Sequence, residues 1–497
     1  MKSTSRAINR FFLQRSAYLL LLGISVVACS IYLFSSYHAH SLGFPLDDAW
    51  IHQTYARNLV NFGEWAFIPG IISGGSTSPL WTLMIAIGYL FRLQHLFWAY
   101  CLGVMILLGI AVYGQRLFDH FSGHRHRFPV AGIFLILEWH LIWAAVSGME
   151  TLLSGLIILA TFVYLVQSSR PGWLLGSLVG ISIWCRPDGV LLFAPVIGCF
   201  ILSRENTLQK VHRLKNFAIG ITVCVVPYLI FNYLTQRSIL PGTFYAKQAE
   251  YASQSTVPIF LRFVEQLSLP LVGAGVLLLP GAIYLFYRAL MARNWNVVLI
   301  YAWLLGFAGL YAWRLPVSYQ HGRYLIPVMP VYFTLGLAGL RLIQQRLGEE
   351  GIWRRIVIKS WGISVGMVLL GFVFLGARSY AVDVAIIETE MVRTAKWLSV
   401  NTRPGDVLAV HDIGAIGYYV NSPIIDLAGL VSPEVIPFIR DEGRIKEYLD
   451  QKNVKYLVTF PGWYPDLVRN LQPVYKSGGD FAEKAGGENM VVYLWQN

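Results

Sequence analysis

Long apolar runs separated by short basic connections dominate the first three quarters of this 497-residue chain. A helix needs about 20 consecutive apolar residues to cross the hydrocarbon core of a bilayer, and runs of about that length recur along this part. The pattern predicts eleven spanning helices. They cover residues 17–36, 96–117, 128–146, 152–167, 171–185, 188–203, 216–234, 268–287, 296–313, 324–342 and 358–376.

A further apolar stretch at residues 79–91 has only 13 residues and ends at Arg92. It is too short to span comfortably, and a crossing there would move every later basic connection to the opposite side. We therefore expect a juxtamembrane or re-entrant helix on the outer side. The first run has a basic flank and no small-residue cleavage pattern, so it is interpreted as an uncleaved span rather than a signal peptide.

The basic residues indicate how the chain is oriented, because short cytosolic connections collect Lys and Arg. The N-terminus is accordingly expected in the cytoplasm, and loops 37–95 and 235–267 and the C-terminal region outside the cell, in a multi-pass protein of the plasma (inner) membrane. The basic positions are Arg6, Arg10, Arg15, Arg116, Arg125, Arg127, Arg204, Lys210, Arg213, Lys215, Arg288, Arg293, Arg341, Arg346, Arg354, Arg355 and Lys359.

From about Ser379 the pattern changes to short apolar runs between polar, turn-rich segments. Residues 406–410, 423–427, 454–460 and 490–495 are typical of buried strands, and residues 388–400 and 443–452 of helices. The sequence thus predicts two parts: a transmembrane domain over 1–378, with its first outer loop at 37–95, and a small extracytoplasmic α/β domain over 379–497.

Composition excludes several functions. Charged residues make up 13% of the chain, about half the share usual in soluble domains. The net charge of +12 follows from the basic connections, so nucleic acid is not expected as a partner. All five cysteines fall in apolar runs, which supports neither disulfides nor a cysteine metal site. The sequence contains no Walker A loop, HExxH zinc motif or GxSxG elbow in a suitable context.

The first candidate for chemistry is the acid pair Asp47-Asp48, directly after the first span. Acids there can cap a helix and favour its dipole, but a cap needs only one of them. The alternative is a catalytic base close to the lipid, where a lipid-borne substrate arrives. Arg57 lies farther along the same predicted helix as possible support. The pair can also hold a divalent ion, so a metal is possible but not required.

Four basic residues at predicted outer boundaries are candidates for binding a phosphate. Arg186 is either a snorkelling arginine in a tight turn or aimed at a phosphate. Lys247, with Tyr245 as possible support, lies in a loop that is solvated or contacts an anionic headgroup. His321 and Arg323 precede a span, where interfacial anchoring explains neighbouring tyrosines better than it explains two basic groups.

Glu138 and His140 fall inside a predicted span, two residues apart. On one continuous helix they would point to different faces. Ionisable groups within a membrane indicate function by default, and buried structural pairing explains them equally well.

Taken together, these segments resemble the GT-C superfamily of integral-membrane glycosyltransferases, which use sugars linked to polyprenyl phosphates. The superfamily includes protein O-mannosyltransferases, aminoarabinose transferases and mycobacterial arabinofuranosyltransferases. Two features depart from the family's pattern and bear on acceptor specificity. The chain has Trp50 where tyrosine or phenylalanine is expected, and it lacks an acid in Ile71-Ile-Ser73. The matching segments are Asp47 to Leu59, Phe67-Ile-Pro-Gly70, Gly75-Ser-Thr-Ser-Pro-Leu-Trp-Thr82, Ser147-Gly-Met-Glu-Thr151, Arg186-Pro-Asp-Gly189, Leu240-Pro-Gly-Thr-Phe-Tyr-Ala-Lys247, Gly322-Arg-Tyr-Leu-Ile-Pro327, His411-Asp-Ile-Gly-Ala-Ile-Gly-Tyr418 and Ile425-Asp-Leu-Ala-Gly-Leu430.

The resemblance implies a mainly α fold, a GT-C-like bundle with outer juxtamembrane helices. It implies inverting transfer of a sugar from a polyprenyl-phosphate donor to an acceptor hydroxyl on a glycan, lipid or protein. Asp47 would be the base, Asp48 a positioning group, and Arg186, Lys247, His321 and Arg323 the donor-phosphate site. Two other classes stay open: a flippase of lipid-linked precursors, and a non-catalytic subunit that presents its outer domain.

Overall fold

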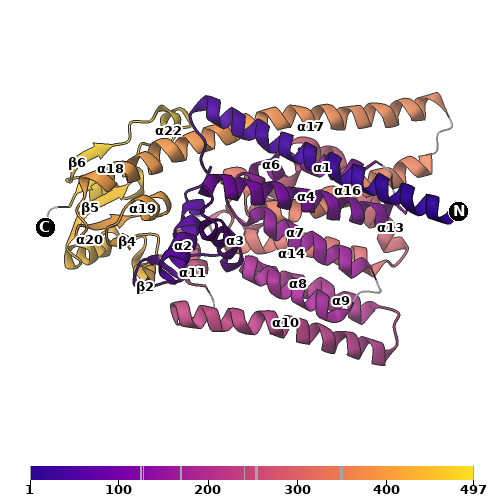
Figure 1. Ribbon diagram of the computed structural model, residues 1–497, viewed down its shortest axis with the longest axis horizontal. Coiled ribbons are helices and arrows are strands. Elements are labelled where there is room, and N and C mark those ends of the chain that lie inside the picture. Colours follow the sequence, from indigo (N-terminus) through magenta and orange to yellow (C-terminus); the bar gives the residue numbers. More distant parts are fainter. Residues whose placement is uncertain are drawn as a thin grey trace.

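The computed structural model describes residues 2–123, 126, 128–167, 171–239, 241–251, 256–347 and 351–495. Of the basic positions and matched segments named above, Arg125, Arg127 and Leu240 lie outside the described residues. A long helical bundle forms one part of the molecule, and a small sheet with short helices forms the other, at the end that carries the C-terminus (Figure 1).

The bundle is that of a multi-pass membrane protein. Within the described residues, seven helical segments are long and apolar enough to cross a membrane. They are Ser16–Ala39 within α1 (Lys2–Ala39), α4 (His95–Ser122), α10 (Thr207–Gln236), Gly273–Met291 with α13 (Leu279–Met291), α14 (Trp295–Arg314), Tyr319–Leu347 with α16 (Met329–Leu347), and Ile352–Asn401 with α17 (Ile352–Ile387).

The other four predicted spans are also helical but shorter. They coincide with the pair α5 (Val130–Leu137) and α6 (Trp139–Ala145), with α7 (Thr151–Val166), with α8 (Gly172–Cys185), and with η1 (Pro187–Leu192) followed by α9 (Phe193–Leu202). The predicted helical bundle is confirmed. The count of eleven crossings and their orientation stay predictions.

The span that contains Glu138 is broken rather than continuous. Glu138 has extended backbone dihedrals between α5 and α6, and its carboxylate accepts a hydrogen bond from the Leu141 amide at 3.2 Å, which caps α6. His140 Nδ1 lies 2.8 Å from Glu138 Oε1, and both side chains are buried. The expectation that these two residues point to different faces is wrong, because it assumed one unbroken helix. In the structure, Glu138 and His140 form a buried pair.

The first loop folds into α2 (Asp48–Phe62), a small hairpin of β1 (Ala66–Ile68) and β2 (Ile71–Ile72), and α3 (Pro79–Leu90). The predicted short helix at 79–91 is therefore present as α3, which Ser78 caps at its N-terminus. The hairpin was not predicted because its strands are too short to show an alternating pattern. A second loop carries α11 (Gly242–Glu250) and α12 (Ile259–Ser268).

The C-terminal part contains a five-stranded sheet in the order β4-β3-β5-β7-β6. The strands β3 (Val407–Val410), β4 (Ile424–Asp426), β5 (Val454–Thr459) and β7 (Val491–Leu494) match the four predicted ones. The edge strand β6 (Gln472–Lys476) was missed because its side chains are mostly exposed and show no apolar alternation. The short helices include α18 (Arg393–Asn401), α19 (Gly414–Tyr419) and α20 (Glu442–Gln451). The compositional boundary at Ser379 falls inside α17, which continues unbroken to Ile387.

The two parts are joined where α19 packs against α2. Arg57 of α2 donates hydrogen bonds to the carbonyls of Tyr418 at 2.5 Å and Gly417 at 3.5 Å, at the end of α19. The ring of Trp50 lies against Tyr418 and Tyr419, with centroids 4.9 and 5.3 Å away. The first loop and the C-terminal part therefore form a common interface, and Arg57 belongs to that interface.

Candidate active site

A cavity of about 370 Å³ opens where the start of α2, the start of α7, η1, α11 and the end of α14 meet. Its wall combines apolar groups such as Met149, Val190 and Leu310 with a set of charged ones. The charged residues in the lining are Asp48, Glu150, Arg186, Asp188, Lys247, Arg314 and Arg323. Three of the predicted phosphate ligands and one of the predicted acids thus meet at one cavity.

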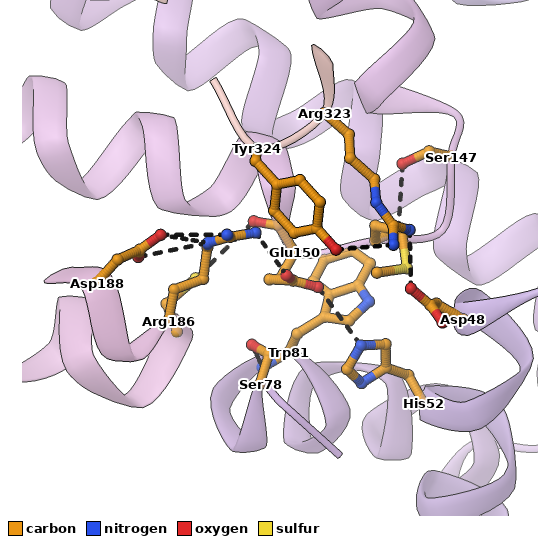
Figure 2. A network of polar contacts seen from close by, with 12 residues as sticks. Asp48, His52, Ser78, Trp81, Ser147, Glu150, Arg186, Asp188, Arg323 and Tyr324 are labelled. Carbon is orange, nitrogen blue, oxygen red and sulfur yellow. Dashed lines mark hydrogen bonds and ion pairs between the residues drawn. The ribbon is translucent and has the colours of Figure 1, made fainter. Parts of the chain in front are cut away.

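Lys247 and Arg323 converge on Asp48. Arg323 Nη1 lies 2.8 Å from Asp48 Oδ2, and Lys247 Nζ lies 3.5 Å from the same oxygen. The Tyr324 hydroxyl accepts hydrogen bonds from Arg323 Nη2 at 3.0 Å and from Lys247 Nζ at 3.4 Å. Figure 2 shows Arg323 between Asp48 and Tyr324. This group carries two positive charges and one negative charge.

The backbone before Arg323 is unusual. Gln320, His321 and Gly322 have φ values of 55°, 58° and 66°, three consecutive residues in the left-handed region. Residues other than glycine adopt it at a cost of roughly 1–2 kcal/mol each. Packing and polar contacts must therefore hold this turn, which sets the direction from which Arg323 enters the cavity.

Arg186 is already neutralised by two acids. Its guanidinium contacts Glu150 Oε1 at 3.1 Å and Asp188 Oδ2 at 3.1 Å, and it donates to the Tyr311 hydroxyl at 2.7 Å. On its other side Glu150 faces His52 Nε2 at 3.4 Å (Figure 2). Arg186 therefore lines the cavity as part of a network with two acids, and its role as a phosphate ligand stays a prediction.

Glu150 was not singled out from the sequence as a site residue. Its side chain is 3% exposed, and the Arg186 and His52 contacts lower its pKa although burial alone would raise it. The available signal was its place in Ser147-Gly-Met-Glu-Thr151, between two apolar runs. Spacing alone gives no reason to connect it with Arg186, 36 residues later.

Asp47 does not contact Lys247 or Arg323 in the described structure, and its carboxylate faces the C-terminal part. Its oxygens accept hydrogen bonds from the backbone amides of Gly414 at 2.6 Å and Ala415 at 2.8 Å. Burial, with repulsion from Asp412, raises the pKa of Asp47 to about 7, against the opposing effect of the two amides. Asp47 is not among the residues that line the cavity.

The neighbouring Asp48 has the opposite electrostatics. Burial alone would raise its pKa, but Lys247 and Arg323 hold the pKa of this carboxyl well below its usual range. Lys247 and Arg323 therefore favour the ionised form of Asp48, whereas burial and Asp412 favour the protonated form of Asp47. Two adjacent carboxyls with separated pKa values suit two different tasks.

His321 and Tyr245 do not line the cavity. His321 Nε2 lies 2.7 Å from Asp383 Oδ2 on α17, and the Trp143 indole donates to the same carboxylate at 2.9 Å. This contact anchors the left-handed turn before Arg323, so His321 lies behind the cavity rather than in it. Tyr245 lies in α11 with 46% of its surface exposed.

A divalent ion at the acid pair stays a prediction, and the two carboxylates have different partners. The carboxylate of Asp47 faces two amide donors and that of Asp48 faces two cations. Across the described ranges, no group of three or more His, Cys, Asp or Glu side chains is placed to hold a metal.

Comparison with solved structures shows the fold. The chain superposes on ArnT from Cupriavidus metallidurans bound to undecaprenyl phosphate with a TM-score of 0.60 and 14% identity, covering 96% of this chain and 97% of that one. The apo form of the same protein gives 0.61. The oligosaccharyltransferase of Archaeoglobus fulgidus in its apo form gives 0.57 with 10% identity, over 88% of this chain and 69% of that one. The fold that the predicted resemblance implied is confirmed, because the chain shares the fold of these two proteins.

Sequence comparison adds a single finding. Residues 383–493 match a family described as a domain of unknown function, DUF8728. No curated protein sequence matches the chain.

Proposed function

We propose that this chain is an inverting glycosyltransferase that moves a sugar from a polyprenyl-phosphate carrier to an acceptor hydroxyl on the outer face of the membrane. The observation that carries the proposal is the cavity in which Lys247, Arg323 and the Tyr324 hydroxyl converge beside an acid pair. The GT-C fold supports it, as does the ArnT structure, whose bound ligand is undecaprenyl phosphate.

The chemistry is a single displacement. The acceptor oxygen attacks the anomeric carbon, the bond from that carbon to the phosphate oxygen breaks, and its electron pair stays on the phosphate. The donor is a phosphodiester and leaves as a phosphomonoester, so one negative charge is added there. Lys247 and Arg323 stabilise that charge where water is largely excluded. A one-step displacement inverts the anomeric configuration.

We assign Asp47 as the base that takes the proton of the acceptor hydroxyl. A base works best when its pKa lies near the operating pH, and the pKa of Asp47 is raised to about 7. The Gly414 and Ala415 amides leave further lone pairs on its oxygens for an incoming hydroxyl. In this assignment the acceptor reaches Asp47 from the side that α19 does not cover, and the donor occupies the cavity beside Asp48. A glycan, a lipid and a protein all offer suitable hydroxyls.

The test uses purified protein in sealed proteoliposomes with a panel of labelled polyprenyl-phosphate sugars. Release of the sugar with inversion supports the proposal. Movement of the intact donor between leaflets, without cleavage, would instead identify a flippase. If neither release nor movement is found with any donor, the result favours a non-catalytic subunit.

The assignment of Asp47 is tested by Asp47→Asn, which should lower turnover by roughly 100- to 10,000-fold and leave binding of undecaprenyl phosphate intact. Asp466→Asn is the matched control, because it removes one acid from an exposed site in the C-terminal part. Near-normal turnover in Asp47→Asn would remove this residue from the mechanism.

A further inference from the structure

The two cations best placed for a phosphate are already occupied by a carboxylate of the same chain. Asp48 Oδ2 lies 2.8 Å from Arg323 Nη1 and 3.5 Å from Lys247 Nζ. Besides Arg314, which also lines the cavity, a phosphate that enters is attracted to Arg323 and Lys247, because Arg186 is compensated by Glu150 and Asp188. It must share them with Asp48 or displace it.

Asp48 is held at this position by its two ion pairs. In the described part of the chain, its carboxylate receives no hydrogen bond of the kind that backbone amides donate to Asp47. Its side chain is 26% exposed, although Oδ2 itself is buried, so the carboxylate can gain water by turning that oxygen away from the cations. The two neighbours therefore differ: Asp47 accepts from backbone amides, and Asp48 contacts side-chain cations that a phosphate can also bind.

The charge of the ligand changes during the proposed reaction. The donor phosphodiester carries one negative charge, whereas a phosphomonoester carries about −1.5 to −2 at neutral pH. A site of two cations therefore binds the product more tightly than the donor. Without a competing anion, the spent carrier would remain bound and limit turnover.

We propose that Asp48 is a built-in competitor for the phosphate: it yields Lys247 and Arg323 when the donor binds, and recaptures them to expel the polyprenyl phosphate product. This inference rests on the proposed function. It assigns Asp48 to product release and leaves proton transfer with Asp47.

The inference predicts a gain of affinity from the loss of a site residue. Asp48→Asn removes the competing charge while keeping the size of the side chain. It should bind undecaprenyl phosphate at least tenfold more tightly than the unaltered protein. Its turnover should fall, with a rapid first transfer of about one sugar per protein followed by slow steady-state turnover once a donor is known.

The binding experiment uses full-length protein in nanodiscs titrated with undecaprenyl phosphate, and with undecaprenol as the same lipid without its phosphate. Asp466→Asn again serves as a control for the loss of one acid, and Arg323→Ala should weaken binding of the phosphate form. The tightening should appear for the phosphate and be absent for the alcohol. Asp48→Ser, which lacks both the charge and the amide, should tighten binding as well and replaces Asp48→Asn if that variant does not fold.

Unchanged or weaker binding of undecaprenyl phosphate by the folded Asp48 variants would overturn the inference, as would equal tightening for undecaprenol. Those outcomes leave the proposed function standing as long as the unaltered protein prefers the phosphate over the alcohol. If the unaltered protein shows no such preference, the proposed function fails and the inference falls with it.

Discussion

Gly414→Ala should disable the proposed base without removing any chemical group from it. Gly414 begins α19 and lies directly against Asp47. A Cβ at this position would lie 2.0 Å from the carbonyl oxygen of Asp47 and 2.7 Å from its carboxylate carbon and Oδ2. Contacts below 3.0 Å are essentially never seen for real Cβ atoms, and the nearest of these atoms belongs to backbone, which cannot rotate away.

The size of the effect follows from these distances. Moving the Cβ from 2.0 to 3.0 Å requires the start of α19 to retreat by about 1 Å. The Gly414 amide, now 2.6 Å from Asp47 Oδ2, would then lie at roughly 3.6 Å, beyond hydrogen-bonding range. A hydrogen bond to a charged group contributes about 1.5–3 kcal/mol, so weakening both amide bonds costs up to about 3–6 kcal/mol. A misplacement of about 1 Å at a reacting group typically lowers the rate on the order of 100-fold.

The pH dependence of the transfer rate provides an independent test. Burial and Asp412 raise the pKa of Asp47, and the two amides lower it. The balance of these effects is a pKa of about 7. Losing the amides raises that pKa further. Because the base acts only when deprotonated, the acidic limb of the pH–rate profile should move to higher pH in Gly414→Ala.

The assay compares transfer rates and pH profiles of Gly414→Ala and Gly405→Ala. Gly405 lies in the same part of the chain, has no neighbour within 4 Å of an added Cβ and has no positive φ, so its substitution should be silent. Gly414→Ala should also add little to Asp47→Asn, since both act through one contact. Equal turnover and identical pH profiles in the two glycine variants would refute the reasoning.

Three further outcomes are expected. Arg323→Lys should weaken binding of undecaprenyl phosphate about as much as Arg323→Ala, because lysine keeps the charge but not the fork that serves two partners; full retention of affinity would show that charge alone suffices. Asp412→Asn should move the acidic limb of the pH–rate profile to lower pH, because Asp412 raises the pKa of Asp47 by repulsion; a shift upward would contradict this coupling. Single cysteines at Arg204 and Ser399 in a cysteine-free background test the orientation with an impermeant thiol reagent: intact cells should label position 399 and protect position 204, and the reverse pattern would invert the topology.

The sequence predicted the helices well because a bilayer leaves the backbone few options. With no water in the hydrocarbon core, a crossing segment must satisfy its own amides and carbonyls, so apolar length is a sufficient signal. In the C-terminal part, short apolar runs predicted the four strands whose side chains are mainly buried. This pattern missed β6, whose side chains are mostly exposed. It also missed the break at Glu138, because hydropathy shows a polar residue within an apolar run but not that this residue caps a new helix.

The candidate site was predicted only in part. Asp48, Arg186, Lys247 and Arg323 do line one cavity, as residues at one predicted membrane boundary should. The ion-pair partners of these residues could not be predicted from the sequence, because pairing depends on which loops meet in the folded protein. His321 is paired with Asp383, and Arg186 with Glu150 and Asp188.

By itself, the sequence determined that this chain builds a helical membrane bundle with a small α/β part, and which residues stand at the boundary where chemistry is possible. Only the tertiary structure distinguished the two adjacent acids. Asp47 finds its amide donors 367 residues away, at Gly414, while Asp48 faces Lys247 and Arg323. The physical reason is that the apolar pattern of a helix can be recognised from neighbouring residues. The partners of a charged side chain lie within a few ångströms of it and come from segments that are distant in sequence.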